Sequence, residues 1–130
     1  ILGHYNTITD EISWVNGGHQ PALLRDKNGK FEQFESAAPP MGVIQQKNKS
    51  LYKINRTKLN GKRFYAFTDG LSESLDSKGN EIGIEGSIKI IEKNFNDDVS
   101  KQLSNIAKDV EKSSGKNKLS DDLTLIAIGK

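Results

Sequence analysis

The hydrophobic positions of this chain follow two different periods. Up to Thr68, short apolar runs alternate with turn residues, which is typical of β-strands. From Ile84 onward, apolar residues recur at every third or fourth position, which indicates helices with one buried face. A final apolar run, Leu123–Ile128, returns to the strand pattern. Strands followed by two helices and a last strand predict an α+β fold, with a mostly antiparallel sheet and the helices packed on one face.

Turn residues divide the first part of the chain into separate strands. Asp26–Gly29 is expected to be a hairpin turn, because Asn-Gly supplies the positive φ angles that a tight turn requires, and Asn60-Gly61 is expected to be another turn. Two consecutive prolines, Pro39 and Pro40, predict an irregular loop, since proline cannot donate to a sheet ladder. The predicted strands are Ile1–Thr9, Ile12–Asn16, Ala22–Arg25, Phe31–Phe34, Leu51–Leu59 and Arg63–Thr68. Trp14 and the phenylalanines occupy strand positions and are expected in the core.

Two helices are predicted from the second period. The first covers Gly86–Phe95, and the second begins near Asp98 or Ser100, either of which is a suitable N-terminal cap. A polar stretch, Lys112–Lys118, is expected to be a linker before the last strand. Leu71–Leu75 follows Asp69-Gly70, and Asp76–Asn80 is expected to be a polar loop.

Composition and charge remove several classes of function. The chain has 130 residues, enough for one domain over residues 1–130, and its net charge of +2 is too small to predict nucleic-acid or membrane binding. No cysteine is present, which excludes a disulfide scaffold, a thiolate zinc site and a cysteine nucleophile. A reducing cytoplasm is compatible with this. The first residue is Ile1 and the only methionine is Met41, so we expect a processed product or a piece of a longer protein.

Two acidic motifs lie at the ends of apolar runs. Asp69, followed by Gly70, ends the run that starts at Arg63, and Asp121-Asp122 precedes the last run. If these strands are antiparallel neighbours, their carboxylates meet at one edge of the sheet. Clustered carboxylates repel one another unless a cation lies between them, and hard divalent cations prefer oxygen ligands. The motifs therefore predict a Mg²⁺ or Mn²⁺ site.

Each of these motifs also has a simpler interpretation. Asp69-Gly70 is a common turn pair, and Asp121-Asp122 could close a polar linker. His19 is either a general acid or metal ligand, or a loop histidine that bonds to neighbouring backbone. A centre with two metal ions also needs at least one further acid. The other acids considered as ligands are Asp10, Glu11, Glu73, Asp76, Glu81 and Glu85.

Five segments together resemble a known family. Asn16–Leu24 is similar to the Asn-Ala-Gly-His-x-Pro-x-Leu-Leu signature of SpoIIE-type bacterial phosphatases, a branch of the metal-dependent type 2C Ser/Thr phosphatases. Phe67–Ser74 resembles the family's Tyr-Thr-Asp-Gly-Leu-x-Glu-Ala, and Asp121–Leu125 resembles its Asp-Asp-Ile-Thr-Leu. Pro40-Met41-Gly42 and Gly79–Gly83 resemble two shorter motifs of the family. The five segments occur in the family's order and cover nearly the whole chain.

The resemblance implies a fold, a reaction and a site. The fold would be a sandwich of two antiparallel sheets flanked by helices. The reaction would be hydrolysis of phosphoserine or phosphothreonine by water that two Mn²⁺ or Mg²⁺ ions activate. Asp69 would be a metal ligand with Gly70 beside it, Asp121 a second ligand, and Asp122 would lie beside Asp121 in or next to the site. Substrates would be phosphorylated regulatory proteins such as anti-sigma-factor antagonists, and a sensor or receiver domain would lie upstream, in a cytoplasmic protein.

One family motif is missing from this chain. The family places another metal-binding aspartate in an Asp-x-x-Gly-His-Gly motif upstream of the His19 region, and no such motif occurs here. The chain is therefore expected to be the C-terminal portion of the catalytic domain and inactive alone. Uncovered apolar faces and strand edges would favour a homodimer or a higher assembly. The alternative is a non-catalytic module that uses the phosphatase fold to bind a partner.

Overall fold

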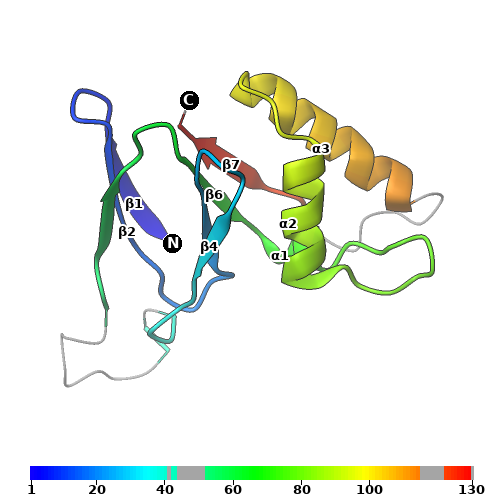
Figure 1. Cartoon of the computed structure of the whole chain (residues 1–130). Helices are drawn as coiled ribbons and strands as arrows, with labels where there is room; N and C mark the ends of the chain where they lie inside the picture. Colours follow the sequence, from blue (N-terminus) through cyan, green and yellow to red (C-terminus); the bar gives the residue numbers. More distant parts are fainter. Residues whose placement is uncertain (41, 44–51, 115–121, 130) are drawn as a thin grey trace. The chain divides into compact units, whose positions relative to one another are not determined.

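The computed structural model of the chain describes residues 1–40, 42–43, 52–114 and 122–129 (Figure 1). These residues contain seven strands and three helices in an α+β arrangement, as the hydrophobic pattern predicts. They divide into two compact units, one made of Ile1–Ala66 with Gly129 and the other of Phe67–Ile128. None of the described helices has the length and apolar character that crossing a membrane requires.

The first sheet lies within the first unit. Its strands are β1 (Leu2–Asn6), β2 (Glu11–Val15) and β5 (Asn55–Lys58), in the order β1-β2-β5 with antiparallel pairing. β1 and β2 form a hairpin because Asn6 and Asp10 shape the turn between them. The Asn6 side-chain oxygen accepts hydrogen bonds from the main-chain N–H groups of Ile8 and Thr9, and Asp10 has a φ of 56°.

The second sheet has the strand order β4-β3-β6-β7. In the first unit, β3 pairs antiparallel with β4 on one side and β6 on the other. A tight turn precedes β6, where Asn60 and Gly61 have φ angles of 47° and 83° and Lys62 N donates to Leu59 O over 2.8 Å. The predicted turn at Asn60-Gly61 is thereby confirmed, and it joins β5 of the first sheet to β6 of the second. The strands are β3 (Ala22–Arg25), β4 (Phe31–Phe34), β6 (Arg63–Phe67) and β7 (Leu125–Ile128).

Trp14 forms the centre of the first unit's core, as its strand position predicts. Its indole is 2% exposed and contacts the rings of Phe34 and Phe64, each with a centroid distance of 5.0 Å. Trp14 belongs to the first sheet and the two phenylalanines to the second, so these aromatic contacts join the inner faces of the two sheets. The burial alternates along β2, where Ile12 and Trp14 are buried and their neighbours are not.

The second unit contains the helices α1 (Asp69–Ser72), α2 (Gly83–Lys93) and α3 (Val99–Ser114). α2 and α3 pack through their apolar faces, whose most buried members are Ile91, Ile106 and Val110. Gln102 is fully buried between them, and its Nε2 donates to Ile91 O over 3.1 Å, which satisfies a carbonyl near the end of α2. Lys93 pairs with Asp109 over 2.8 Å on the surface.

The structure corrects several of the predicted element boundaries. The first strand ends at Asn6, because the turn through Asp10 takes the residues up to Thr9. The predicted linker Lys112–Lys118 is wrong at its start, since α3 continues to Ser114. Leu71, for which no element was predicted, belongs to the short helix α1. Asp98 is confirmed as the cap of α3, because its Oδ1 accepts a hydrogen bond from Lys101 N over 3.1 Å.

Candidate metal centre

Asp69 is placed by the strand that precedes it. β6 is buried along almost its whole length, so its end is fixed by packing, and α1 begins at Asp69 immediately afterwards (Figure 1). Thr68 lies between the two elements in an extended conformation, with φ −75° and ψ 164°. The chain therefore turns sharply at the end of a buried strand, and Asp69 is exposed at that turn.

Asp122 is brought to the same place by Thr68. The Thr68 hydroxyl donates to Asp122 O over 2.9 Å and accepts a hydrogen bond from Thr124 N over 3.0 Å. The main-chain N–H of Thr68 donates to Thr124 O over 3.0 Å. These three bonds join the end of β6 to the residues that precede β7, across more than fifty positions of sequence.

Gly70 allows the two segments to approach closely. It is buried, and a Cβ atom at this position would lie 2.6 Å from Asp122 O and 2.9 Å from Asp122 C. Any larger residue would have to move the backbone of Asp122, so only glycine fits without a shift. The tight packing at Gly70 and the Thr68 hydrogen bonds place Asp69 and Asp122 at one edge of the second unit.

Three of the four residues predicted for the metal site lie at this edge. Asp69, Gly70 and Asp122 come together where β6 ends and β7 approaches, which the antiparallel-neighbour interpretation requires. Gly129, beyond the other end of β7, lies against Lys62 ahead of β6, as expected for an antiparallel pair. Asp121, the fourth residue, lies outside the described residues.

Within the described part of the chain, no further acidic side chain groups with Asp69 and Asp122 as a third metal ligand. Those residues contain no group of three or more His, Cys, Asp or Glu side chains that could hold a metal ion. Asp10 and Asp76 instead shape turns: Asp10 accepts hydrogen bonds from the Tyr5 hydroxyl and Asn60 N, and Asp76 from Lys78 N and Asn80 N. The side chains of Asp69 and Asp122 are both carboxylates, which are the ligands that a hard divalent cation prefers. Two carboxylates alone do not complete the coordination shell of such a cation.

His19 belongs to a loop that Asn16 organises. Asn16 is 4% exposed; its Nδ2 donates to Gln20 O over 3.0 Å and to Phe34 O over 3.5 Å, and its Oδ1 accepts from His19 N over 3.0 Å. The His19 ring lies with Nδ1 3.3 Å from Gln20 O. These contacts favour the interpretation of His19 as a loop histidine bonded to neighbouring backbone.

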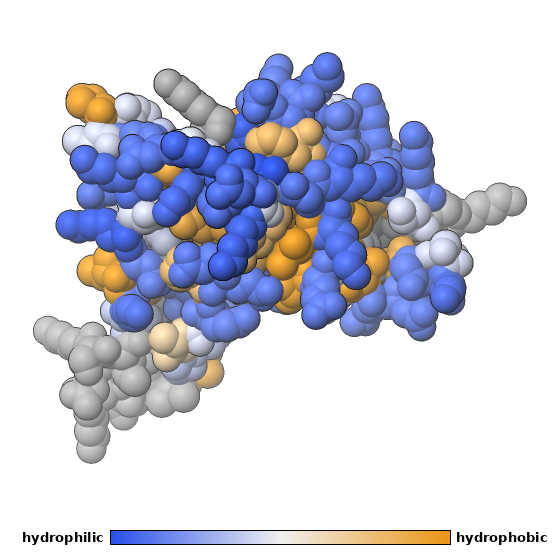
Figure 2. All heavy atoms as spheres, in the orientation of Figure 1, coloured by the Kyte–Doolittle hydropathy of each residue, from blue (hydrophilic) through white to orange (hydrophobic). Residues whose placement is uncertain are grey.

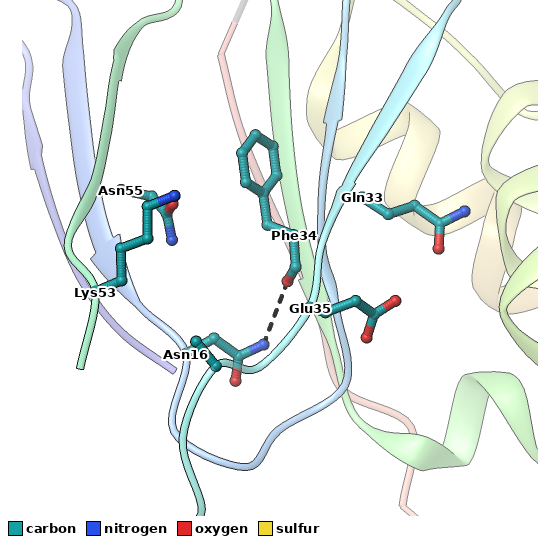
Figure 3. A pocket seen from close by; sticks show the side chains of 7 residues that line it. Asn16, Gln33, Phe34, Glu35, Lys53 and Asn55 are labelled. Atoms are coloured by element: carbon teal, nitrogen blue, oxygen red, sulfur yellow. Dashed lines mark hydrogen bonds between the residues drawn. The ribbon is translucent and has the colours of Figure 1, made fainter. Parts of the chain in front are cut away.

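A pocket of about 290 Å³ opens beside this loop in the first unit (Figure 3). In Figure 3, Gln33 and Glu35 point to the opposite side of their strand from the Phe34 ring, and Lys53 extends toward Asn55. The lysine and glutamate side chains therefore do not converge on one point. The residues that line the pocket are Asn16, Gln33, Phe34, Glu35, Ala37, Lys53 and Asn55. The sequence does not reveal this pocket, because its lining residues come from three separate segments.

Similar structures have been solved for several phosphatase domains. The SiaA-PP2C domain of Pseudomonas aeruginosa matches with a TM-score of 0.76 and 14% identity, over 94% of this chain and 47% of that one. The SpoIIE phosphatase domain of Bacillus subtilis, presoaked with Mn, matches with a TM-score of 0.67 and 12% identity, over 98% and 54%. The RsbU and RsbW domains of a Mycobacterium tuberculosis protein match with a TM-score of 0.65 and 21% identity, over 98% and 34%.

These similarities define the fold and the extent of the match. The chain spans about half or less of the length of the solved chains that it resembles. RsbX, another similar structure with a TM-score of 0.59, was solved in complex with magnesium. Among curated protein sequences, none matches this chain. The family model for stage II sporulation protein E matches residues 1–130. The chain therefore has a type 2C phosphatase-like fold and belongs to the SpoIIE family.

Proposed function

We propose that this chain is the C-terminal portion of a metal-dependent phosphatase domain that hydrolyses phosphoserine or phosphothreonine on a regulatory protein. The observation that carries the proposal is the edge at which the Thr68 hydroxyl bonds to Asp122 O and Gly70 packs against the same carbonyl, with Asp69 between Thr68 and Gly70 in the sequence. A carboxylate at the tip of a buried strand, held against a second acidic segment, suits a cation that must be positioned rigidly. Membership of the SpoIIE family supports the same reaction.

The metal would be Mn²⁺ or Mg²⁺, with two ions in the complete domain. Asp69 and Asp122 would hold it together with Asp121 and with ligands that the rest of the domain supplies. Bound ions would generate a water nucleophile at neutral pH and neutralise charge on the phosphoryl oxygens. The chain's own contribution is to fix the carboxylates: Gly70 permits the close approach, and β6 anchors the turn. The Mn-presoaked SpoIIE domain and the magnesium complex of RsbX support this choice of ions.

A phosphatase assay on two lengths of protein tests this proposal. Residues 1–130 alone should show no Mn²⁺-dependent turnover of a chromogenic phosphate ester, because the metal shell is incomplete. The full-length protein should turn the ester over, and Asp69→Asn should abolish that activity. Robust turnover by the 130 residues alone would contradict the idea that the chain is an incomplete catalytic portion.

The substrate would be a phosphorylated anti-sigma-factor antagonist. The full-length phosphatase would be a cytoplasmic protein with a sensor or receiver domain upstream of this chain. The similarity to a protein that carries RsbU and RsbW domains supports a regulatory setting of this kind. Candidate phosphoproteins from the same organism, each incubated with the full-length protein and Mn²⁺, would identify it by loss of phosphate in mass spectra. If only small esters and no phosphoprotein are hydrolysed, the regulatory assignment is wrong.

A second candidate function is a non-catalytic module that binds a partner through the phosphatase fold. The observation that favours it is the lack of a third ligand among the described residues. The Asp69→Asn variant of the full-length protein separates the two. If the biological output of the protein is unchanged by this substitution, the binding role is supported.

We also propose that the isolated chain self-associates. Figure 2 shows hydrophobic areas between the hydrophilic side chains of the face in view. Leu2 and Ile54 are 70% and 65% exposed and line a shallow, mostly apolar depression on the first sheet with Val15. Exposed apolar area of this kind favours association with another copy. Light scattering at low concentration should therefore give a mass above that of the 14.4 kDa monomer, and a clean monomer would contradict the proposal.

A further inference from the structure

We infer that Thr68 is a positioning residue for the candidate metal centre, through its hydroxyl group. This inference rests on the proposed function, since it concerns the same site. Thr68 itself has no ligand role here. Its hydroxyl acts on the backbone of the opposite acidic segment, and through that backbone on where the Asp122 carboxylate lies relative to Asp69.

The hydrogen bonds of Thr68 define the position of that segment at two points. The hydroxyl donates to Asp122 O and accepts from Thr124 N, so one oxygen atom bonds to the main chain on both sides of Leu123. The Thr68 main-chain N–H adds a bond to Thr124 O. A side chain that both donates and accepts fixes direction as well as distance, because reversing the segment would place two donors or two acceptors against each other.

The packing at Gly70 makes this control necessary. The Asp122 carbonyl lies so close to Gly70 that a Cβ there would meet it at 2.6 Å. The same carbonyl oxygen accepts the Thr68 hydroxyl at 2.9 Å. Gly70 therefore sets how close the two segments can come, and Thr68 keeps them at that distance. Groups that orient metal ligands in this way typically change metal affinity about 10- to 100-fold when they are removed.

Valine is the replacement that isolates the hydroxyl, because it keeps the branched shape of threonine. Thr68→Val should weaken Mn²⁺ binding by the full-length protein roughly tenfold or more in calorimetric titrations. Thr68→Ser retains the hydroxyl and should bind Mn²⁺ close to the level of the parent protein. The matched control is Thr57→Val in β5, where the hydroxyl donates to the neighbouring Lys58 O. This control should leave Mn²⁺ affinity unchanged.

Amide hydrogen exchange provides a second measurement that does not depend on activity. In Thr68→Val, the Thr124 amide loses its acceptor and should exchange faster than in the parent, while the amides of β2 and β3 should not change. If Thr68 had a purely structural role, Thr68→Val would lower the melting temperature without this local pattern of exchange. Thr68→Ser would then not restore Mn²⁺ affinity.

Asp69→Asn distinguishes failure of the inference from failure of the proposed function. If Asp69→Asn weakens Mn²⁺ binding and Thr68→Val does not, the positioning role of Thr68 is wrong and the metal centre stands. If neither substitution changes Mn²⁺ affinity, the metal is not held at this edge and both ideas fail. Equal loss of affinity in Thr68→Val and Thr57→Val would show a general loss of stability and would also overturn the inference.

Discussion

Asp26 and Asp76 use their carboxylates in a way that Asp69 does not, although all three precede a glycine within three positions. The Oδ1 atom of Asp26 accepts main-chain N–H bonds from Asn28 and Lys30 over 2.8 and 2.9 Å. Asp76 does the same with Lys78 and Asn80, again over 2.8 and 2.9 Å. In both loops the carboxylate closes an Asp-x-x-Gly turn and has a structural role.

Asp69 has a different local environment. Its main-chain oxygen accepts hydrogen bonds from Glu73 N and from the Ser72 hydroxyl, as expected at the start of a helix. No hydrogen bond from the described residues reaches its carboxylate. Asp69 starts a helix, and its carboxylate does not close a turn as those of Asp26 and Asp76 do.

The largest expected effect on stability comes from Gly70→Ala. The added Cβ would collide with Asp122 O, so the edge between β6 and β7 must open. The free energy of unfolding should fall by about 1–3 kcal/mol, the usual cost of overpacking. Urea denaturation measures it. Gly3→Ala is the control, because its nearest contact would be an ordinary 3.5 Å, and an equal loss in both variants would contradict the close-approach argument.

A smaller loss is expected from Asp76→Ala. The substitution removes the acceptor for two main-chain N–H groups, so the loop 76–80 should become less ordered and the melting temperature should drop by less than in Gly70→Ala. Asp76→Asn keeps a side-chain oxygen and should recover most of the loss. If alanine and asparagine behave alike, the turn does not depend on these hydrogen bonds.

The two turn aspartates should also contribute to stability in a pH-dependent way. Main-chain hydrogen bonds, chiefly from Lys30 N and Asn80 N respectively, lower the pKa of Asp26 and of Asp76. The carboxyl pKa is lower in the folded protein than in the unfolded protein, where it is about 3.9. Each carboxylate therefore stabilises the fold at pH values above about 3.9, and this stabilisation is lost as the pH falls through the folded-state pKa. NMR titration of both carboxyl groups checks this, and pKa values at or above 3.9 would contradict it.

The smallest change in stability is expected for Asp69→Asn. Since no described residue bonds to the carboxylate, neutralising it should change the free energy of unfolding by less than about 0.5 kcal/mol in the absence of metal. The same urea measurement applies, with EDTA present. A large loss would show that Asp69 supports the fold, and the contrast with Asp76 would then disappear.

Local signals in the sequence predicted much of the fold. The alternation of Ile12 and Trp14 with polar neighbours predicts the buried face of β2, and Asn60-Gly61 predicts the tight turn between β5 and β6, because few other pairs accept two positive φ angles. The short helix α1 was not predicted. Its four residues are too few to show a helical period, and it depends on how the buried end of β6 is held.

The candidate site was predicted as a pair of acidic motifs, without the means by which they meet. Asp69 and Asp122 could be named because each flanks an apolar run. Thr68 could not be identified as their link, since its hydroxyl partners lie more than fifty residues away. Likewise, the pattern predicted strands but did not assign them to two sheets, because an apolar strand position looks the same in either sheet.

By itself, the sequence determined the strand and helix periods, the turn positions and the acidic residues next to the buried strands. Those properties depend on neighbouring residues and on the geometry of one element at a time. The tertiary structure alone decided that Trp14 joins two sheets, that the Asp69 carboxylate differs from those of Asp26 and Asp76, and that Gly70 lies against Asp122. Contacts between distant segments fix these features, because close packing and hydrogen-bond geometry constrain segments only once they are adjacent.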